Sequence, residues 1–212
     1  SMRQLRQLLL ALLVSLTFTG VAKAQYYEMA SHMTDMLWPA LSGNANYKGY
    51  VEASYLKGIG EDRVDFVDIS TTQGVKFANW FYLGVGAAVD VMLPSVDYTH
   101  HKYDASIMVP LYADFRFSVG NPSKVGVNLD IRFGTAFVFD EFPTTNGYLL
   151  EDENLYIRPT LSVRFPINKN NPKQAINVGV SYQLLLNEWE SHYYFDDAKA
   201  FHNVGATIGF EW

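Results

Sequence analysis

WFYLGVGAAVDVML, residues 80–93, predicts a long β-strand because its apolar residues recur at every second position. The odd-numbered residues of this stretch are all apolar, whereas the even-numbered ones include Tyr82, Gly84, Gly86 and Asp90. Seven apolar positions at this period need about 13 residues, which is long for a soluble sheet but enough to cross a bilayer in a tilted strand. The stretch therefore favours a strand with one wholly apolar face.

The same pattern recurs along most of the chain. Five further segments follow it clearly, namely 107–119, 125–139, 155–167, 175–187 and 201–212, and two follow it more weakly, namely 50–55 and 67–77. The total of eight is even, as bacterial single-chain barrels require. Pro159 falls on an apolar face and predicts a local irregularity. We expect an all-β fold, an eight-stranded antiparallel up-and-down transmembrane β-barrel with a short N-terminal helix.

A soluble lipocalin-like barrel would show the same alternation with its apolar face inward. Connection lengths favour the membrane barrel, since outer-membrane barrels alternate short periplasmic turns with longer outer loops. Short turns are expected at 78–79, 120–124 and 168–174, and longer loops at 94–105, 140–153 and 188–200.

Aromatic residues support the membrane alternative. On this topology, seven of them share the outward face at the periplasmic end, as an interfacial girdle would: Phe77, Phe81, Phe115, Phe117, Phe165, Phe210 and Trp212. The closing Phe210-Glu211-Trp212 also resembles the signal that the barrel assembly machinery reads. We expect that machinery as a partner in biogenesis and outer-membrane lipid as the surroundings.

The N-terminus predicts export. Residues 1–24 have basic residues, a short apolar run and Ala22-Lys23-Ala24, the pattern of a cleaved secretory signal peptide. Ser1, before Met2, is interpreted as a cloning remnant. Residues 25–46 are expected to form a helix and linker, either packed near a barrel mouth or acting as a movable plug, and 47–212 the barrel. These features predict the outer membrane of a Gram-negative bacterium.

Composition excludes several classes of function. Cys is absent, which removes disulfides and thiolate chemistry. The formal net charge is −6, with no basic block beyond the first residues, so we expect no nucleic-acid partner. The aromatic fraction of 15% favours strands and interfacial anchors.

Several stretches of the sequence resemble the sequences of a known family. The stretches PALSGNANYKGYVEASYLKGIG (39–60), STTQGVKFANWFYLGVGAAVDVML (70–93), VPLYADFRF (109–117) and YIRPTLSVRF (156–165) resemble the small, porin-like outer-membrane β-barrel proteins of Bacteroidetes. The resemblance implies the barrel fold. It implies no catalytic positions, because the functions of that family are mostly unassigned.

The inward charges are the main candidate site. Six acids face five bases on the inward positions: Glu52, Asp68, Asp90, Asp114, Asp130 and Glu211 against Lys76, Arg116, Arg132, Arg158 and Arg164. An eight-stranded barrel has room only for side chains, so we expect an ion-paired filling rather than an open pore. A proton or small-ion path through these charges is the alternative. The small Gly84 and Gly86 are expected to make room for large neighbours.

The expected outer loops supply the second set of candidates. Five aromatic residues in or beside them either contact a surface glycan or protein partner or form an upper aromatic girdle: Tyr98, Tyr103, Trp189, Tyr193 and Tyr194. No loop spacing matches a metal motif, so we expect no metal and no cofactor. A lipid-modifying enzyme is the other alternative, but the chain lacks the G-x-S-x-G and H-E-x-x-H patterns, and we expect no enzymatic activity.

Overall fold

The protein is described from a computed structural model, in which residues 45–60, 63–77, 79–93, 95–96, 102–139, 142–143, 149–150, 153–168, 171–187 and 200–212 are placed. The signal peptide expected at 1–24 and nearly all of the helix and linker expected at 25–46 lie outside these residues. The described residues include no helix with the length and apolarity needed to cross a membrane.

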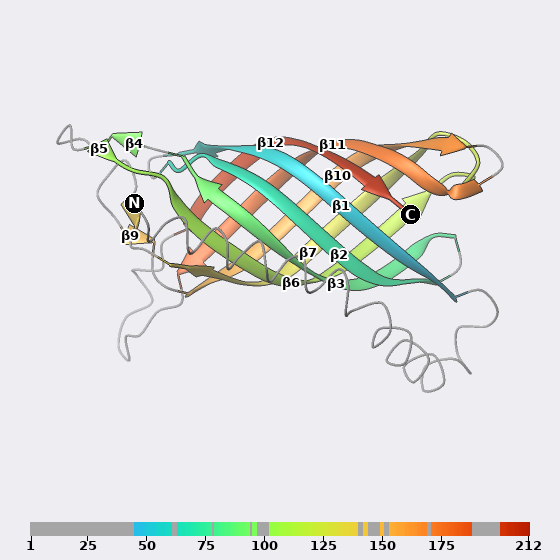
Figure 1. Ribbon diagram of the computed structural model, residues 1–212, viewed down its shortest axis with the longest axis horizontal. Helices are drawn as coiled ribbons and strands as arrows, with labels where there is room; N and C mark the ends of the chain where they lie inside the picture. Colours follow the sequence, from blue (N-terminus) through green and yellow to red (C-terminus); the bar gives the residue numbers. More distant parts are fainter. Residues whose placement is uncertain are drawn as a thin grey trace.

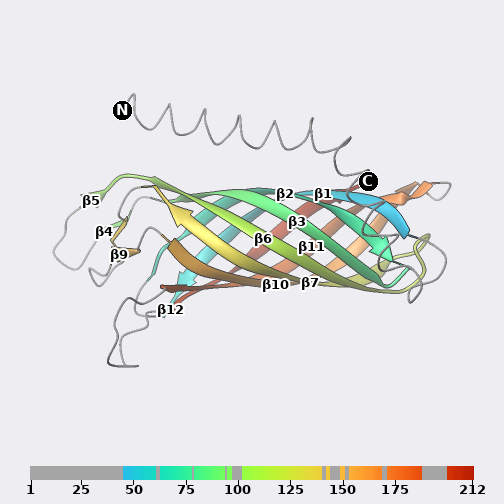
Figure 2. The same ribbon diagram turned by 90° about the horizontal axis from the view of Figure 1, so that it is seen from below.

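Eight long strands close into a single barrel (Figures 1 and 2). They are β1 (Ala45–Ile59), β2 (Phe66–Phe77), β3 (Phe81–Met92), β6 (Ser106–Val119), β7 (Gly126–Val138), β10 (Glu153–Asn168), β11 (Asn171–Asn187) and β12 (Ala200–Glu211). Consecutive long strands pair antiparallel, and β1 pairs with β12 to complete the circle. The prediction of an eight-stranded up-and-down barrel is therefore confirmed.

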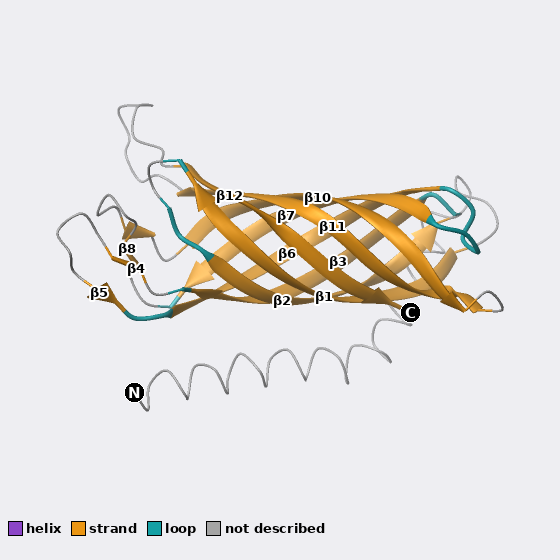
Figure 3. Cartoon of the chain, turned by 90° about the horizontal axis from the view of Figure 1, so that it is seen from above, coloured by secondary structure: helices purple, strands orange, loops and turns teal. Residues whose placement is uncertain are grey.

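The two ends of the barrel differ in their connections. One end, here called the turn end, carries the start of β1, the end of β12 and the connections 78–80, 120–125 and 169–170. The other, here called the loop end, carries the connection 60–65 and the longer segments 93–105, 139–152 and 188–199. Two small hairpins, β4 (Ser95–Val96) with β5 (Lys102–Tyr103) and β8 (Phe142–Pro143) with β9 (Leu149–Leu150), project beyond the loop end (Figure 3).

Some boundaries differ from the sequence-based expectation. The turn expected at 168–174 is only 169–170, because β10 and β11 pair as far as Asn168 and Asn171. Trp80, expected as the first residue of a strand, lies in the turn before β3. Pro159 interrupts the β10–β11 ladder between Ile157 and Thr160 without changing the register, since proline has no N–H to donate.

Alternation in each strand separates an inward face, which carries most of the buried charged side chains, from an outward face that is mainly apolar. In β1, Glu52 and Ser54 are buried, whereas Val51, Ala53 and Tyr55 are exposed. Exposed apolar residues of the outer face include mid-strand positions: Ile69 is 64% exposed and Val180 is 61% exposed. A water-soluble barrel would leave this apolar surface uncovered.

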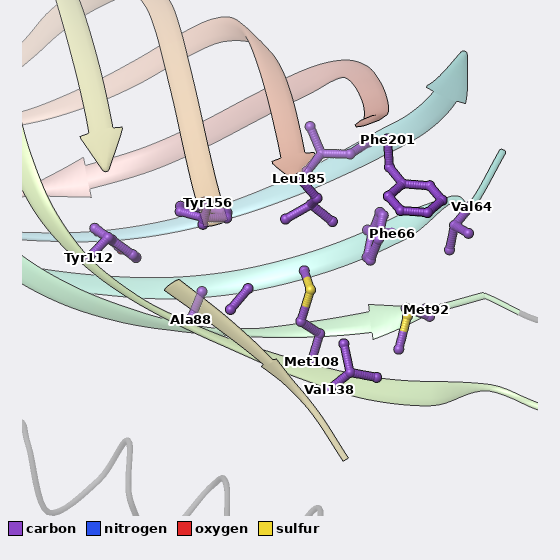
Figure 4. Packing of buried hydrophobic residues seen from close by; sticks show 12 residues of the cluster. Val64, Phe66, Ala88, Met92, Met108, Tyr112, Val138, Tyr156, Leu185 and Phe201 are labelled. Carbon is purple, nitrogen blue, oxygen red and sulfur yellow. The ribbon is translucent and has the colours of Figure 1, made fainter. Parts of the chain in front are cut away.

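The apolar core of the barrel lies inside, near the loop end. Leu56, Phe66, Met92, Met108 and Phe201 are buried there, each from the loop-end part of its strand. Figure 4 shows several of these side chains directed into a common space. The lumen is thus closed at the loop end by apolar packing.

Inward glycines make the lumen wide enough for its large side chains. A Cβ on Gly84 would lie 2.3 Å from the Tyr82 hydroxyl, and one on Gly86 would lie 2.6 Å from the Tyr112 ring. The expectation that Gly84 and Gly86 make room for large neighbours is confirmed.

Candidate functional site

The centre of the lumen holds a cluster of five charged side chains. Arg116 contacts Glu52, Asp114 and Asp130, with nitrogen–oxygen distances of 2.8, 2.8 and 3.3 Å. Arg132 forms ion pairs with Glu52 and Asp130, the latter at 3.2 Å. All five are buried, so neither guanidinium can be removed without leaving a carboxylate poorly compensated.

These charges come from opposite sides of the barrel. Glu52 is on β1, whereas Arg116 and Arg132 are on β6 and β7, and no ladder joins β1 to β6 or β7. The carboxylate of Glu52 therefore reaches its partners across the lumen rather than along the wall. This crossing blocks the interior at its middle.

Tyrosine rings pack against both arginines of this cluster. The Arg116 guanidinium carbon lies 3.7 Å from the centre of the Tyr50 ring, and that of Arg132 lies 4.9 Å from the Tyr112 ring. Tyr50 and Tyr82 pack edge to face at 5.1 Å. A cation over an aromatic face is favoured electrostatically, which helps to fix both guanidinium groups.

A second charged group lies toward the loop end. Arg158 Nη1 is 3.1 Å from Asp68 Oδ2, and Arg158 Nη2 donates to Ser54 and to Thr207. Asp90 stands opposite Asp68 in the register of β2 and β3, and it is fully buried. One guanidinium thus faces two carboxylates.

A third charged group lies at the turn end. Glu211 Oε1 accepts from Lys48 Nζ and from Arg164 Nε, each at 2.6 Å, and its other oxygen accepts from the Asn177 amide at 3.0 Å. Arg164 also donates to the backbone carbonyls of Pro122 and Pro172. Lys76 Nζ donates to Ser118 Oγ at 3.3 Å.

The structure brings ten of the eleven predicted lumen residues into these three groups, and the eleventh, Lys76, lies beside the third. Sequence reasoning missed Lys48, which is inward and buried. Its even number matches Glu52 on the same strand, but the expected strand began only at Tyr50. With Lys48 included, six acids face six bases.

Sequence reasoning also missed the apolar closure at the loop end. Its residues, including Phe66, Met92 and Met108, occupy the same alternate positions as the inward charges of their strands. The alternation of the sequence contains this signal, because Met92 and Met108 fall on the same face of their strands as Asp90 and Asp114.

The predicted girdle residues lie on the outer face near the turn end. Phe81 lies 6.0 Å from Phe77 and 5.4 Å from Phe117, and Phe210 stacks on Trp212 at 6.0 Å. Phe115 and Phe165 lie on the same face of β6 and β10 without a ring contact to this group among the described residues. Trp80, predicted at an inward position, instead joins the girdle and stacks on Phe117 at 6.5 Å.

The predicted loop contacts mostly lie outside the described residues. These are Tyr98, Trp189, Tyr193 and Tyr194, whereas Tyr103 lies in β5. Within the described ranges, no three His, Cys, Asp or Glu side chains come together as a metal site would require.

Comparison with known proteins identifies the fold alone. No family model and no curated protein matches the chain. Among solved structures, Neisserial surface protein A (NspA) is 12% identical with a TM-score of 0.55, over 80% of this chain and 98% of that one. The outer-membrane enzyme PagL is 9% identical with a TM-score of 0.52, over 74% of this chain and 97% of that one.

The alignments cover nearly the full length of both comparison structures. At these identities, the likeness carries the barrel fold and not the activity. The resemblance to the Bacteroidetes family stays a prediction. The chain has the fold of the small outer-membrane β-barrels.

Proposed function

We propose that the protein is an integral outer-membrane β-barrel with a closed lumen, which serves a structural or surface-interaction role. The buried cluster of Glu52, Arg116, Arg132, Asp114 and Asp130 carries the proposal, since it crosses the lumen at its centre. A transport pathway would need water-filled space at this level. The cluster instead fills it with paired side chains.

The membrane location is supported by the outer face. Large apolar side chains are exposed along the mid-strand positions, and aromatic side chains gather near the turn end. This is the arrangement by which barrels contact hydrocarbon and its interface. By the rule that short turns face the periplasm, the turn end is periplasmic and the loop end faces outward.

Conductance tests the closed lumen. The purified protein is reconstituted in planar bilayers beside a porin as positive control, and we expect no stepwise current above the leak of the bilayer. Stable channel openings would contradict the closed lumen and favour the channel alternative.

The surface role is tested at the loop end. Residues 188–199 are replaced by a short Gly-Ser connection, and a glycan array and a pull-down from host material are compared with the intact chain. The matched control replaces the turn 120–125 at the opposite end. Loss of a bound glycan or protein only in the loop variant supports the role, whereas equal binding by all three chains counts against it.

A further inference from the structure

The charges of the lumen balance in total but not along its length. The central group holds three acids and two arginines, and the group toward the loop end holds Asp68 and Asp90 with Arg158. Each group therefore holds one acid more than it holds bases. The turn end holds Lys48, Lys76 and Arg164 against Glu211 alone, which leaves a surplus of two positive charges.

A cavity of about 210 Å³ lies at this positive end. Four cationic side chains line it, namely Lys48, Lys76, Arg164 and Lys173, together with Asn79 and Trp212. Lys48 and Arg164 share the single acid Glu211, so Lys48, Lys76 and Arg164 together exceed the acid by two positive charges. Since a water occupies about 30 Å³ in the liquid, the cavity has room for a group of several oxygen atoms.

The cavity wall is held by its own hydrogen bonds. Arg164 donates 2.6 Å and 2.5 Å bonds to the carbonyls of Pro122 and Pro172, which ties the turn 120–125 to the start of β11. Lys48 Nζ donates to the Lys173 carbonyl at 3.2 Å as well as to Glu211. Arg164 and Lys48 thus act as fixed positive groups in the wall.

Lys76 differs from these two cations. Its ammonium group has three N–H donors, and it bonds to a neutral partner, Ser118 Oγ at 3.3 Å, rather than to a carboxylate. Lys76 therefore contributes positive charge that Glu211 does not offset, and Lys173 lines the same cavity. Closely spaced cations in a partly buried site repel one another, and a bound anion relieves that repulsion.

We propose that the turn end of the barrel contains a binding site for a small dianionic oxyanion of the phosphate class, held by Lys76 and Lys173 beside Lys48. A dianion matches the surplus charge better than a single carboxylate. The phosphate can be free in solution or the headgroup of a phosphate monoester lipid. The site depends on the fold alone and not on the closed lumen or its surface role.

The test is a titration with inorganic phosphate, followed by amide and indole chemical shifts of the whole barrel in nanodiscs of zwitterionic lipid. We expect saturable shifts confined to the cavity, including Lys76, Asn79 and the Trp212 indole, and no such shifts with chloride at equal ionic strength. Shifts that do not saturate, or that spread over all exposed cations, would overturn the site.

Variants separate a built site from general attraction to a basic surface. Lys76→Met and Lys173→Met each keep an apolar stem and remove one charge, and we expect each to weaken phosphate binding roughly tenfold. Lys124→Met is the matched control, because Lys124 is an exposed cation at the same end that does not line the cavity. Equal weakening in all three variants would overturn the proposal, and unchanged spectra away from the cavity verify that each variant folds.

A second arm distinguishes the two sources of phosphate. Nanodiscs that contain phosphatidic acid present a phosphate monoester headgroup in the bilayer. If the same residues shift without free phosphate, and free phosphate competes, the site takes the lipid headgroup. If they shift only with free phosphate, the site takes a soluble anion.

Discussion

Substitution of Arg132 by Met is expected to destabilise the barrel through the loss of one buried cation. Arg132 is fully buried, forms ion pairs with Glu52 and Asp130, and donates to Ser70 Oγ at 3.1 Å. Met retains much of the side-chain volume but none of the charge. The variant therefore isolates the electrostatic loss from the creation of a cavity.

The magnitude follows from the remaining partners. Removal of one member of a buried ion pair typically costs about 3–5 kcal/mol in the free energy of unfolding. Arg116 still contacts both Glu52 and Asp130 after the substitution, so the lower limit of about 3 kcal/mol is expected. Glu52→Gln should also destabilise, and the double variant should lose less than the sum of the two, with a coupling of about 1–3 kcal/mol.

The assay is urea unfolding in phospholipid vesicles, followed by tryptophan fluorescence and by the mobility of folded and unfolded protein in gels. Lys124→Met removes an exposed cation and should change the free energy of unfolding by no more than about 0.5 kcal/mol. A loss below about 1 kcal/mol for Arg132→Met, or simple additivity in the double variant, would refute the account of a coupled ion cluster.

Three further predictions test the outer face, the barrel wall and the apolar closure at the loop end. Each is a loss in the free energy of unfolding, measured by unfolding in vesicles. Val180→Arg, at a mid-strand outward position that is 61% exposed, should cost about 2–4 kcal/mol, whereas the same change at the strand-end Val119 should cost about 1 kcal/mol or less; equal costs would argue against a lipid-facing surface. Gly205→Ala would place a Cβ 1.8 Å from the Tyr55 carbonyl oxygen, so we expect a loss of at least about 1–3 kcal/mol or failure to fold, and a neutral effect would show that the wall can move. Phe66→Ala should cost about 3–5 kcal/mol because the ring is fully buried at the loop end, and a smaller loss would mean that this closure is loosely packed.

The alternation of side chains made much of the barrel predictable. In a strand, successive side chains point to opposite faces, so the positions of Asp90 and Val85 within their strand are enough to place them on opposite faces of the sheet. The lengths of the turns and loops then indicate which end of each strand is expected at the periplasmic side. The predicted ends of the strands were less accurate. The strand expected at 50–55 begins at Ala45 in the structure and therefore includes Lys48.

The turns show why boundaries were harder to assign. Trp80 continues the period of residues 80–93 in the sequence, yet it lies in a turn and packs on the outer face against Phe117. Periodicity does not record where the backbone ladder ends. That limit is set by the pairing of β2 with β3, which stops at Phe77 and Phe81.

The sequence by itself placed Glu52, Arg116 and Arg132 on the inward face, because a period of two gives each residue one face and the connection lengths and aromatic positions indicated which face is the outer one. It could not determine that Glu52 contacts both arginines, or that Asp68 faces Arg158 while Lys48 and Arg164 share Glu211. Those pairs join strands that are far apart in the chain. They are decided by the stagger of the strands when β1 closes on β12, since that stagger sets which inward residues stand at the same height in the lumen.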